Sequence, residues 1–454
     1  MNLPSNSTNL LSGRVVSGVI DSALMQPGAT RCIAVMPGNE VFTNIGLITT
    51  SSLSDSARAG IAPNMASHYM LSGTEHVSVI NINAAEAVAF AMDVSGMPRL
   101  TTLQGSSALL SSLNLTGCPV LADISLTSVM IGGVLDLRGC PNMANVNCQR
   151  SDITDVYLEG CTGLYTLALS NNPAPALHNV EECTYLHSLI VNDCQYTSLP
   201  EVPNTLTVMN CGTNPLSILD VSAYTELTEL TCSQCDLTEL DVSANTKLRA
   251  LFCDGNSIEN LDLTSNTALY SLQCGGAALT TLTMPSNAAT RMDNVRITSA
   301  SMTSLDFRNY TRMRTLNVIG CTSLTSLQLT ACTGLYTLNC NSCTGLTSLD
   351  VTGLTNLYYL TVSGVPLGTG AGLTGLASLT GTAGSTAHSI YLQQCSLSAA
   401  QLDDIFTQLP TKTTGYWVWT IYIKNNPSVG DTSGTTGCDK TIATNKGWVV
   451  NTTN

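Results

Sequence analysis

Apolar residues recur along the middle of the chain with a fixed period close to 21 residues. The stretch from Leu227 reads apolar-x-x-apolar-x-Cys, and the same phrase begins again at Leu248 and at Leu269. One such period is called a row here, and the rows open at positions 100, 121, 143, 164, 186, 206, 227, 248, 269, 292, 313, 335 and 357. A fixed period of this length indicates a solenoid, in which each repeat packs only against its neighbours.

A second apolar phrase follows the first by about ten residues in many rows. It reads Leu-x-x-Leu-x-Val from Leu216 and from Leu237, and related phrases begin at Ile258 and Leu324. Alternating apolar and polar residues predict short strands with one buried face. We therefore expect each coil to carry two strands on opposite walls, parallel to those of the next coil, and little helix.

The row from Leu248 to Asn266 follows the pattern L-x-x-L-x-C-x-x-N-x-L-x-x-L-D-L-x-x-N, with Ile in place of the third Leu. It resembles the leucine-rich-repeat family, and most closely its 21-residue bacterial class called IRREKO. The shorter row from Leu186 to Leu206 is similar to a neighbouring class with a 20-residue period. The resemblance covers residues 96–385 and implies a β-rich solenoid. It implies little about function, because function lies in sites placed on folds.

Residues 386–454 predict an α/β cap that closes the stack. Ser398 opens a short helix with a capping box, Asp439 caps a second one, and Trp448 begins a last strand. This segment is similar to the closing segment of leucine-rich surface proteins of gut Bacteroidetes and their phages. Residues 1–95 lack the period, and we expect there a small N-terminal β or α+β domain that serves attachment or assembly.

The 18 cysteines fall largely in register with the rows, and asparagines occupy equivalent places in other rows. This register favours small buried side chains and turn residues over a disulfide or zinc framework. The C-x-x-C pairs at Cys232 and Cys340 are five rows apart, roughly 24 Å at strand spacing, so they cannot share one zinc ion. We predict mostly free thiols, as in a reducing cytosol, and neither a metal nor a cofactor.

Two sets of outward residues are candidates for a binding surface. Asp220, Asp241 and Asp262 occupy one outward position of successive rows. They indicate either a cation stripe or carboxylates that accept hydrogen bonds from flanking Ser and Thr, and we favour the second reading. The second set is aromatic and suits sugar or protein contacts, because exposed tyrosines offer flat apolar area and a polar tip. Its members are Tyr165, Tyr270, Tyr336, Tyr358 and Tyr359.

The charge of the chain limits its partners. A net charge of −14 and a pI near 4.6 argue against nucleic acid and anionic membranes. We expect neither an export signal nor a membrane-inserted segment, since no basic start with an apolar core and no run of about 18 apolar residues occurs. The five histidines form no catalytic motif, so we predict no enzyme. An enzyme that uses the repeats as a targeting arm is the least favoured hypothesis.

We therefore expect a structural and binding protein, and we favour a bacteriophage virion component such as a tail, baseplate or head-decoration protein. Residues 1–95 would contact other virion proteins, and the repeats would face a host surface protein or glycan. Such a protein would form a homo-oligomer or part of a larger assembly, and its location would be the virion. The alternative is a bacterial cell-surface adhesin or glycan-binding leucine-rich-repeat protein.

Overall fold

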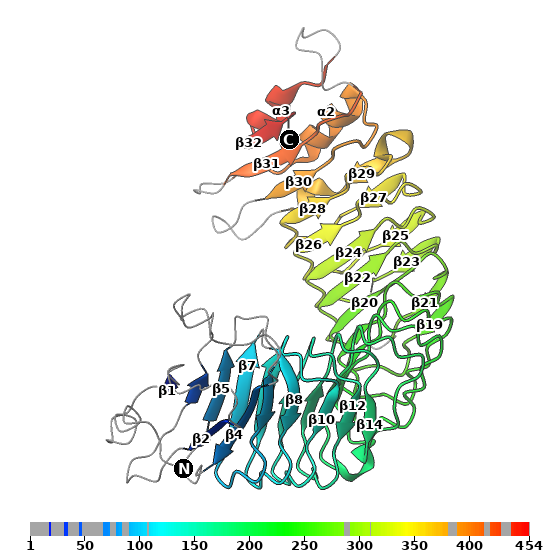
Figure 1. Ribbon diagram of the computed structural model, residues 1–454. Coiled ribbons are helices and arrows are strands. Elements are labelled where there is room, and N and C mark those ends of the chain that lie inside the picture. The colour runs from blue at the N-terminus through cyan, green and yellow to red at the C-terminus, as the bar shows by residue number, and fades with distance from the viewer. Residues whose placement is uncertain are drawn as a thin grey trace. The chain divides into compact units, whose positions relative to one another are not determined.

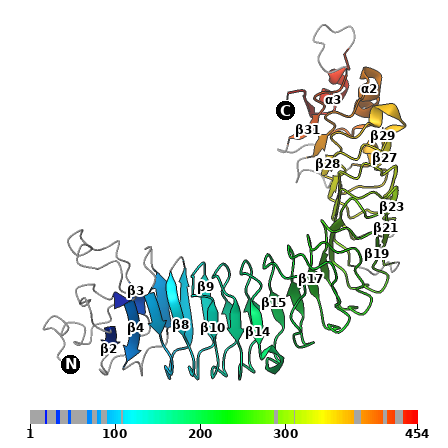
Figure 2. The same ribbon diagram turned by 45° about the vertical axis from the view of Figure 1, so that its right-hand side comes forward.

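The computed structural model divides the chain into two units, Met1–Leu216 and Ser217–Asn454. Figures 1 and 2 show each unit as a stack of coils whose strands run along two walls. The structure describes residues 94–106, 109–285, 291–308, 310–379, 388–412, 418–427 and 437–453, together with the backbone of strands at 18–19, 31–34, 45–47, 67–72, 79–83 and 90–93.

The first unit has two walls of parallel strands. Strands of the main wall pair from one coil to the next, and those of the second wall do the same. The main wall holds β1 (Gly18–Val19), β3 (Ile45–Leu47), β5 (Val79–Asn83), β7 (Thr102–Ser106), β9 (Asp123–Thr127), β11 (Asn145–Asn147), β13 (Thr166–Ala168), β15 (Ser188–Ile190) and β16 (Val208–Asn210). The second wall holds β2 (Arg31–Ala34), β4 (Ser67–Ser72), β6 (Phe90–Asp93), β8 (Leu110–Asn114), β10 (Val134–Asp136), β12 (Asp155–Tyr157) and β14 (Ala176–His178), and is followed by the 3-10 turn η4 (Val180–Glu182).

The second unit repeats this design with a shorter second wall. Its main wall holds β17 (Glu229–Thr231), β18 (Ala250–Phe252), β20 (Ser271–Gly275), β22 (Asn294–Thr298), β24 (Thr315–Ile319), β26 (Thr337–Asn339), β28 (Tyr359–Thr361), β30 (Ser389–Tyr391), β31 (Trp419–Tyr422) and β32 (Trp448–Asn451). Its second wall holds the pairs β19 (Asn260–Asp262) with β21 (Thr281–Thr283), β23 (Ser304–Asp306) with β25 (Ser326–Gln328), and β27 (Ser348–Asp350) with β29 (Gly372–Thr374). The helical elements are η5 (Leu367–Thr369), η6 (Leu376–Ser378), α2 (Ala399–Gln408) and α3 (Lys440–Thr444).

The predicted rows are confirmed, since every row opening is followed two residues later by a main-wall strand. The row from Leu248 shows why. Leu248, Leu251 and Cys253 point inward from the main wall and Leu261 and Leu263 from the other, and all are at most 1% exposed. Burying one such side chain contributes roughly 1.5–3 kcal/mol, so every coil gains from stacking on its neighbour.

The second wall departs from the prediction in one place. The phrases at Leu216 and Leu237 predict strands, but the described residues 197–259 contain no second-wall strand. Leu237 and Val242 are nevertheless fully buried. Inward packing and hydrogen bonds from asparagine side chains, such as Asn245 Nδ2 to Val221 O at 2.9 Å, therefore hold this part of the wall without a ladder of strands.

Cysteine and asparagine ladders run through the coil corners, as the register predicts. The described cysteines form no disulfide and are buried, except Cys438, which is half-buried. Several thiols donate to a carbonyl of the preceding coil, as Cys118 does to Val94 O at 3.1 Å and Cys343 to Val318 O at 3.1 Å. Burial raises the pKa of a thiol such as Cys253 to about 12. A thiol such as Cys253 is therefore a poor nucleophile and serves as a structural side chain.

The predicted cap elements at the C-terminal end are confirmed. Ser398 Oγ accepts from Gln401 N, which completes the capping box of α2, and Asp439 caps α3. Strands β30, β31 and β32 pair in parallel with β28 and with one another. The main wall thus continues past residue 385, while α2 packs near β29 and α3 against β32.

The expected boundary at residue 95 is not marked by a change in the ladder. Strand β5 pairs in parallel with β7, and β6 pairs in parallel with β8. The strands before them, β1 to β4, join the same two walls. Arg31 stands beside Tyr69 of the next coil, and Ile45 beside Ile80, so these coils are much longer than one row. Their length explains why the period of the rows does not reveal these strands.

Candidate functional site

The main wall in the second unit carries four of the five predicted tyrosines, Tyr270, Tyr336, Tyr358 and Tyr359. Tyr270 begins the series and is 49% exposed. Its hydroxyl donates to Asp293 Oδ2 at 2.9 Å, and Arg314 Nε lies 3.5 Å from Asp293 Oδ1. The hydrogen bond to Asp293 raises the pKa of Tyr270. This exposed cluster orients its side chains but contributes little stability, because water screens it.

Tyr336, Tyr358 and Tyr359 lie together, as their register predicts. The ring centroid of Tyr336 is 4.6 Å from that of Tyr358 and 5.6 Å from that of Tyr359. Tyr359 is 38% exposed, but Tyr358 is only 7% exposed. The expectation that Tyr358 is an exposed contact residue is therefore wrong, because its ring is enclosed between Tyr336 and His388, whose centroid is 4.9 Å away.

Tyr358 instead begins a buried aromatic stack at the same register position of successive coils. His388 lies 4.4 Å from Trp419 between ring centroids, and Trp419 lies 5.3 Å from Trp448. Trp448 Nε1 donates to Pro410 O at 2.9 Å. Burial lowers the pKa of His388, so its neutral form is favoured. The stack fixes the main-wall strands of the last coils against one another.

Sequence reasoning missed two further tyrosines on this face. Tyr391 and Tyr422 stand opposite each other on β30 and β31, with ring centroids 4.4 Å apart and planes only 1° from parallel. A signal existed, since His388-Ser-Ile-Tyr391 and Trp419-Thr-Ile-Tyr422 share one pattern of aromatic, hydroxyl, Ile and Tyr. It lay beyond the expected end of the repeats.

We call Tyr336, Tyr359, Tyr391 and Tyr422 the tyrosine face. Earlier strands of the unit present charge on this side, for example Glu229 on β17 and Arg296 on β22. From β26 onward the outward strand positions are all uncharged. They are Thr337, Asn339, Tyr359, Thr361, Ser389, Tyr391, Thr420, Tyr422, Val449 and Asn451.

Tyr165, the fifth predicted tyrosine, belongs to the first unit. It is 50% exposed and its ring stacks on His187 with centroids 4.7 Å apart. His187 Nδ1 lies 2.6 Å from Tyr185 O, which holds the imidazole in place. Tyr165 therefore belongs to a small aromatic group of its own and not to the tyrosine face.

The aspartates of the acidic stripe accept hydrogen bonds from the backbone. Asp220, Asp241 and Asp262 each accept the N–H of the Ser or Thr two residues further on, with N···O distances of 2.8–2.9 Å. Hydrogen bonds from Ser222 and Ser243 lower the pKa of Asp220 and of Asp241. This bears out the reading of carboxylates bonded to flanking Ser and Thr. Within the part of the chain that the structure describes, no three His, Cys, Asp or Glu side chains gather as a metal site would require.

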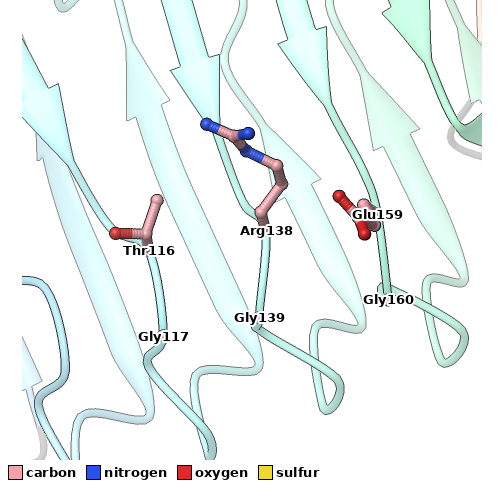
Figure 3. Close-up of a pocket in the computed structure, with 6 residues that line it drawn as sticks. All are labelled: Thr116, Gly117, Arg138, Gly139, Glu159 and Gly160. Carbon is pink, nitrogen blue, oxygen red and sulfur yellow. The ribbon is translucent and has the colours of Figure 1, made fainter.

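A shallow groove crosses the second wall of the first unit, and Figure 3 shows it lined by Thr116, Gly117, Arg138, Gly139, Glu159 and Gly160. The guanidinium of Arg138, the cation in this groove, is already paired, since its Nε and Nη2 donate to the carboxylate of Asp136 at 2.9 and 2.6 Å. The guanidinium also lies 5.3 Å from the Tyr157 centroid. Because this charge is neutralised within the wall, the groove is a weaker candidate for ligand binding than the tyrosine face.

Comparisons with known proteins agree on the fold. No family model matches the chain, and no curated protein matches it. The solved functional domain of InlJ from Listeria monocytogenes, which includes a cysteine ladder, is similar with a TM-score of 0.53 and 20% identity, over 84% of this chain and 74% of that one. A leucine-rich-repeat protein of Leptospira interrogans is similar with a TM-score of 0.48 and 15% identity, over 75% and 90%.

An internalin of Listeria monocytogenes, InlF, is similar with a TM-score of 0.36 and 18% identity, over 62% of this chain and 88% of that one. With the coil geometry above, the likeness to the InlJ domain shows a leucine-rich-repeat solenoid of parallel strands with little helix. None of the helices among the described residues has the length and apolar character needed to span a bilayer.

Proposed function

We propose that the chain is a non-enzymatic binding protein that presents the outward face of the main wall in residues 217–454 to a partner. The observation that carries this proposal is the tyrosine face, whose four tyrosines lie on or next to main-wall strands with uncharged outward positions from β26 onward. Tyr359 is 38% exposed, and Tyr391 and Tyr422 are half-buried. Aromatic side chains of this kind contribute large contact area at a low entropic cost, which is why binding surfaces are enriched in them.

A matched pair of threonines tests the proposal. Thr361 lies on the outward side of β28 in the main wall, and Thr283 is exposed on β21 in the second wall of the same unit. The fluorescently labelled chain is measured by flow cytometry on a panel of bacterial cells and of human epithelial cells. We expect saturable binding to at least one cell type, a loss of about tenfold or more for Thr361→Arg, and little change for Thr283→Arg.

Absence of saturable binding across the panel contradicts the proposal. Equal effects of the two arginines contradict it as well, because binding would then not use the main wall. Both variants introduce the same side chain at a surface position, so a general effect of added charge affects them alike.

We propose display at a bacterial cell surface as the setting of this binding, and a bacteriophage virion as the second candidate. The likeness of the fold to the InlJ domain from Listeria monocytogenes supports the first. The low content of charged side chains, 11%, is compatible with both settings. In the virion setting residues 1–95 attach the chain to other virion proteins or to further copies. Mass spectrometry of purified virions and of surface-shaved cells from the source organism distinguishes the two. The assignment to the 21-residue bacterial IRREKO class also stays a proposal, supported by the row from Leu248. The association with Bacteroidetes is a proposal supported by the closing segment, residues 386–454.

A further inference from the structure

We infer that the tyrosine face binds an uncharged oligosaccharide chain, with sugar rings packed on the outer faces of Tyr391 and Tyr422. The inference rests on the proposed binding function and names the class of its ligand. It depends on three features: the shape of the ring pair, the chemistry of the residues beside it, and the rigidity of its support.

The first feature is the shape of the ring pair. Tyr391 and Tyr422 stack in parallel with centroids 4.4 Å apart, so each ring covers the inner face of the other. Their ladder neighbours on the far sides are Thr361 and Asn451. These side chains are much shorter than a phenol ring, so the outer face of each tyrosine borders a low strip of the surface. The electron-rich face of an aromatic ring attracts the polarised C–H groups of a sugar.

The second feature is the chemistry around the rings. Apart from the tyrosines and Val449, the outward positions of β26 to β32 on the main wall are Thr, Ser and Asn. Hydroxyl and amide groups match sugar hydroxyls, both as donors and as acceptors. The net charge of −14 disfavours acidic glycans and nucleic acid.

The third feature is the rigidity of the support. Ile390 and Ile421, which precede the two tyrosines, are at most 1% exposed. The buried stack from Tyr358 through His388 to Trp419 packs at the same strands. Because the rings are held before any ligand arrives, binding loses little side-chain freedom, and a weak sugar contact is stabilised.

Affinity gel electrophoresis tests the inference. The full chain is run through native gels that contain a mannan, a mixed-linkage β-glucan, an arabinogalactan or an α-glucan, with chondroitin sulfate as the anionic probe. We expect at least one neutral polysaccharide to retard the chain and chondroitin sulfate to leave it unaffected. Tyr391→Ala should weaken retardation about tenfold, while Tyr391→Phe, which keeps the ring, should stay within about twofold.

Two further variants keep the test decisive. Thr361→Phe fills the space beside the outer face of Tyr391 without removing a ring, so it should weaken retardation even where Tyr391→Ala folds poorly. Tyr185→Ala, at a tyrosine that is 64% exposed in the first unit, should change nothing. The inference is overturned if none of the four neutral polysaccharides retards the chain, if only chondroitin sulfate does, or if Tyr391→Ala and Thr361→Phe both bind like the unaltered chain.

The cell-binding measurement separates this inference from the proposed function. Saturable binding to cells without retardation by any neutral polysaccharide overturns the glycan inference alone and leaves a protein partner for the main wall. Loss of both kinds of binding contradicts both proposals.

Discussion

Two asparagines of one row, Asn256 and Asn266, should differ sharply in their contribution to stability. Asn256 makes four buried hydrogen bonds: Oδ1 accepts from Cys235 N at 2.9 Å and Leu237 N at 3.1 Å, and Nδ2 donates to Cys232 O at 2.8 Å and Cys253 O at 2.9 Å. It therefore joins its own coil to the preceding one by satisfying both donors and acceptors.

Asn266 makes only half of these contacts. Its Nδ2 donates to Val242 O at 2.9 Å and to Asn245 O at 3.0 Å. Its buried Oδ1 has no hydrogen-bond partner among the described protein atoms. Replacing Asn266 by alanine removes the unsatisfied Oδ1, but it leaves the carbonyls of Val242 and Asn245 without this donor.

The magnitudes follow from the number of groups left unpaired. A buried polar group without a partner costs about 1–3 kcal/mol, and relaxation recovers part of it. We expect Asn256→Ala to cost roughly 4 kcal/mol and Asn266→Ala roughly 2 kcal/mol. The difference of about 2 kcal/mol corresponds to about 30-fold in the equilibrium for local opening.

Amide hydrogen exchange followed by mass spectrometry is the suitable assay, because unfolding of a repeat array need not be two-state. Peptides that contain Cys235 and Leu237 should exchange at least tenfold faster in Asn256→Ala than peptides of the corresponding corner in Asn266→Ala. Equal acceleration of exchange in the two variants would contradict this prediction, since it would mean that the number of satisfied polar groups does not set the stability of a corner.

Three further predictions concern the same stack. Burial disfavours the thiolate, so the pKa of Cys253 in the folded chain, about 12, lies above that of the unfolded thiol. The contribution of Cys253 to the free energy of unfolding is therefore full below about pH 8.5 and is lost as the pH rises toward 12. Urea unfolding at pH 8 and 10 should show this loss. Cys253→Ala should reduce the slope of the free energy of unfolding against pH by about 1.4 kcal/mol per pH unit. His388 has a lowered pKa, so its contribution to stability is full above about pH 6.5 and falls as the pH drops toward that lowered value. The melting temperature should therefore fall between pH 7 and 5, and His388→Gln should make that fall smaller. Gly275→Ala should lower the free energy of unfolding by roughly 3 kcal/mol or more, because at φ +144° the new Cβ would lie 2.1 Å from Thr298 O. Gly353 has φ +81° and open space around it, so Gly353→Ala should lower that free energy by only about 1–2 kcal/mol. Thermal unfolding of both variants measures the difference.

The period of the sequence was sufficient to predict most of the fold, because inward side chains repeat at every coil. Leu251 and Leu272 face the core for the same reason and are aligned by the same register. The period failed where coil length varies. Strands such as β5 and β31 join the main wall, yet long intervening segments hide their spacing, so the sequence suggested separate segments at both ends.

The candidate site was predictable only in part. The register placed Tyr336 and Tyr359 near each other, but it carries no information on depth, so it did not show that His388 and Tyr336 enclose Tyr358. Tyr391 and Tyr422 were missed because they belong to coils beyond the regular rows. The aspartate stripe was read correctly, since an Asp followed by Ser or Thr two residues later favours a local hydrogen bond over a ligand.

Binding through the tyrosine face should leave a direct mark on the side chains of that face. Hydroxyl-radical footprinting of the chain on the cells that bind it best, with tyrosine oxidation read by mass spectrometry, measures this protection. We expect protection of Tyr359, Tyr391 and Tyr422 on binding, with oxidation of Tyr185 unchanged. Protection confined to residues 94–216, or unchanged oxidation of all three face tyrosines on bound cells, would contradict it.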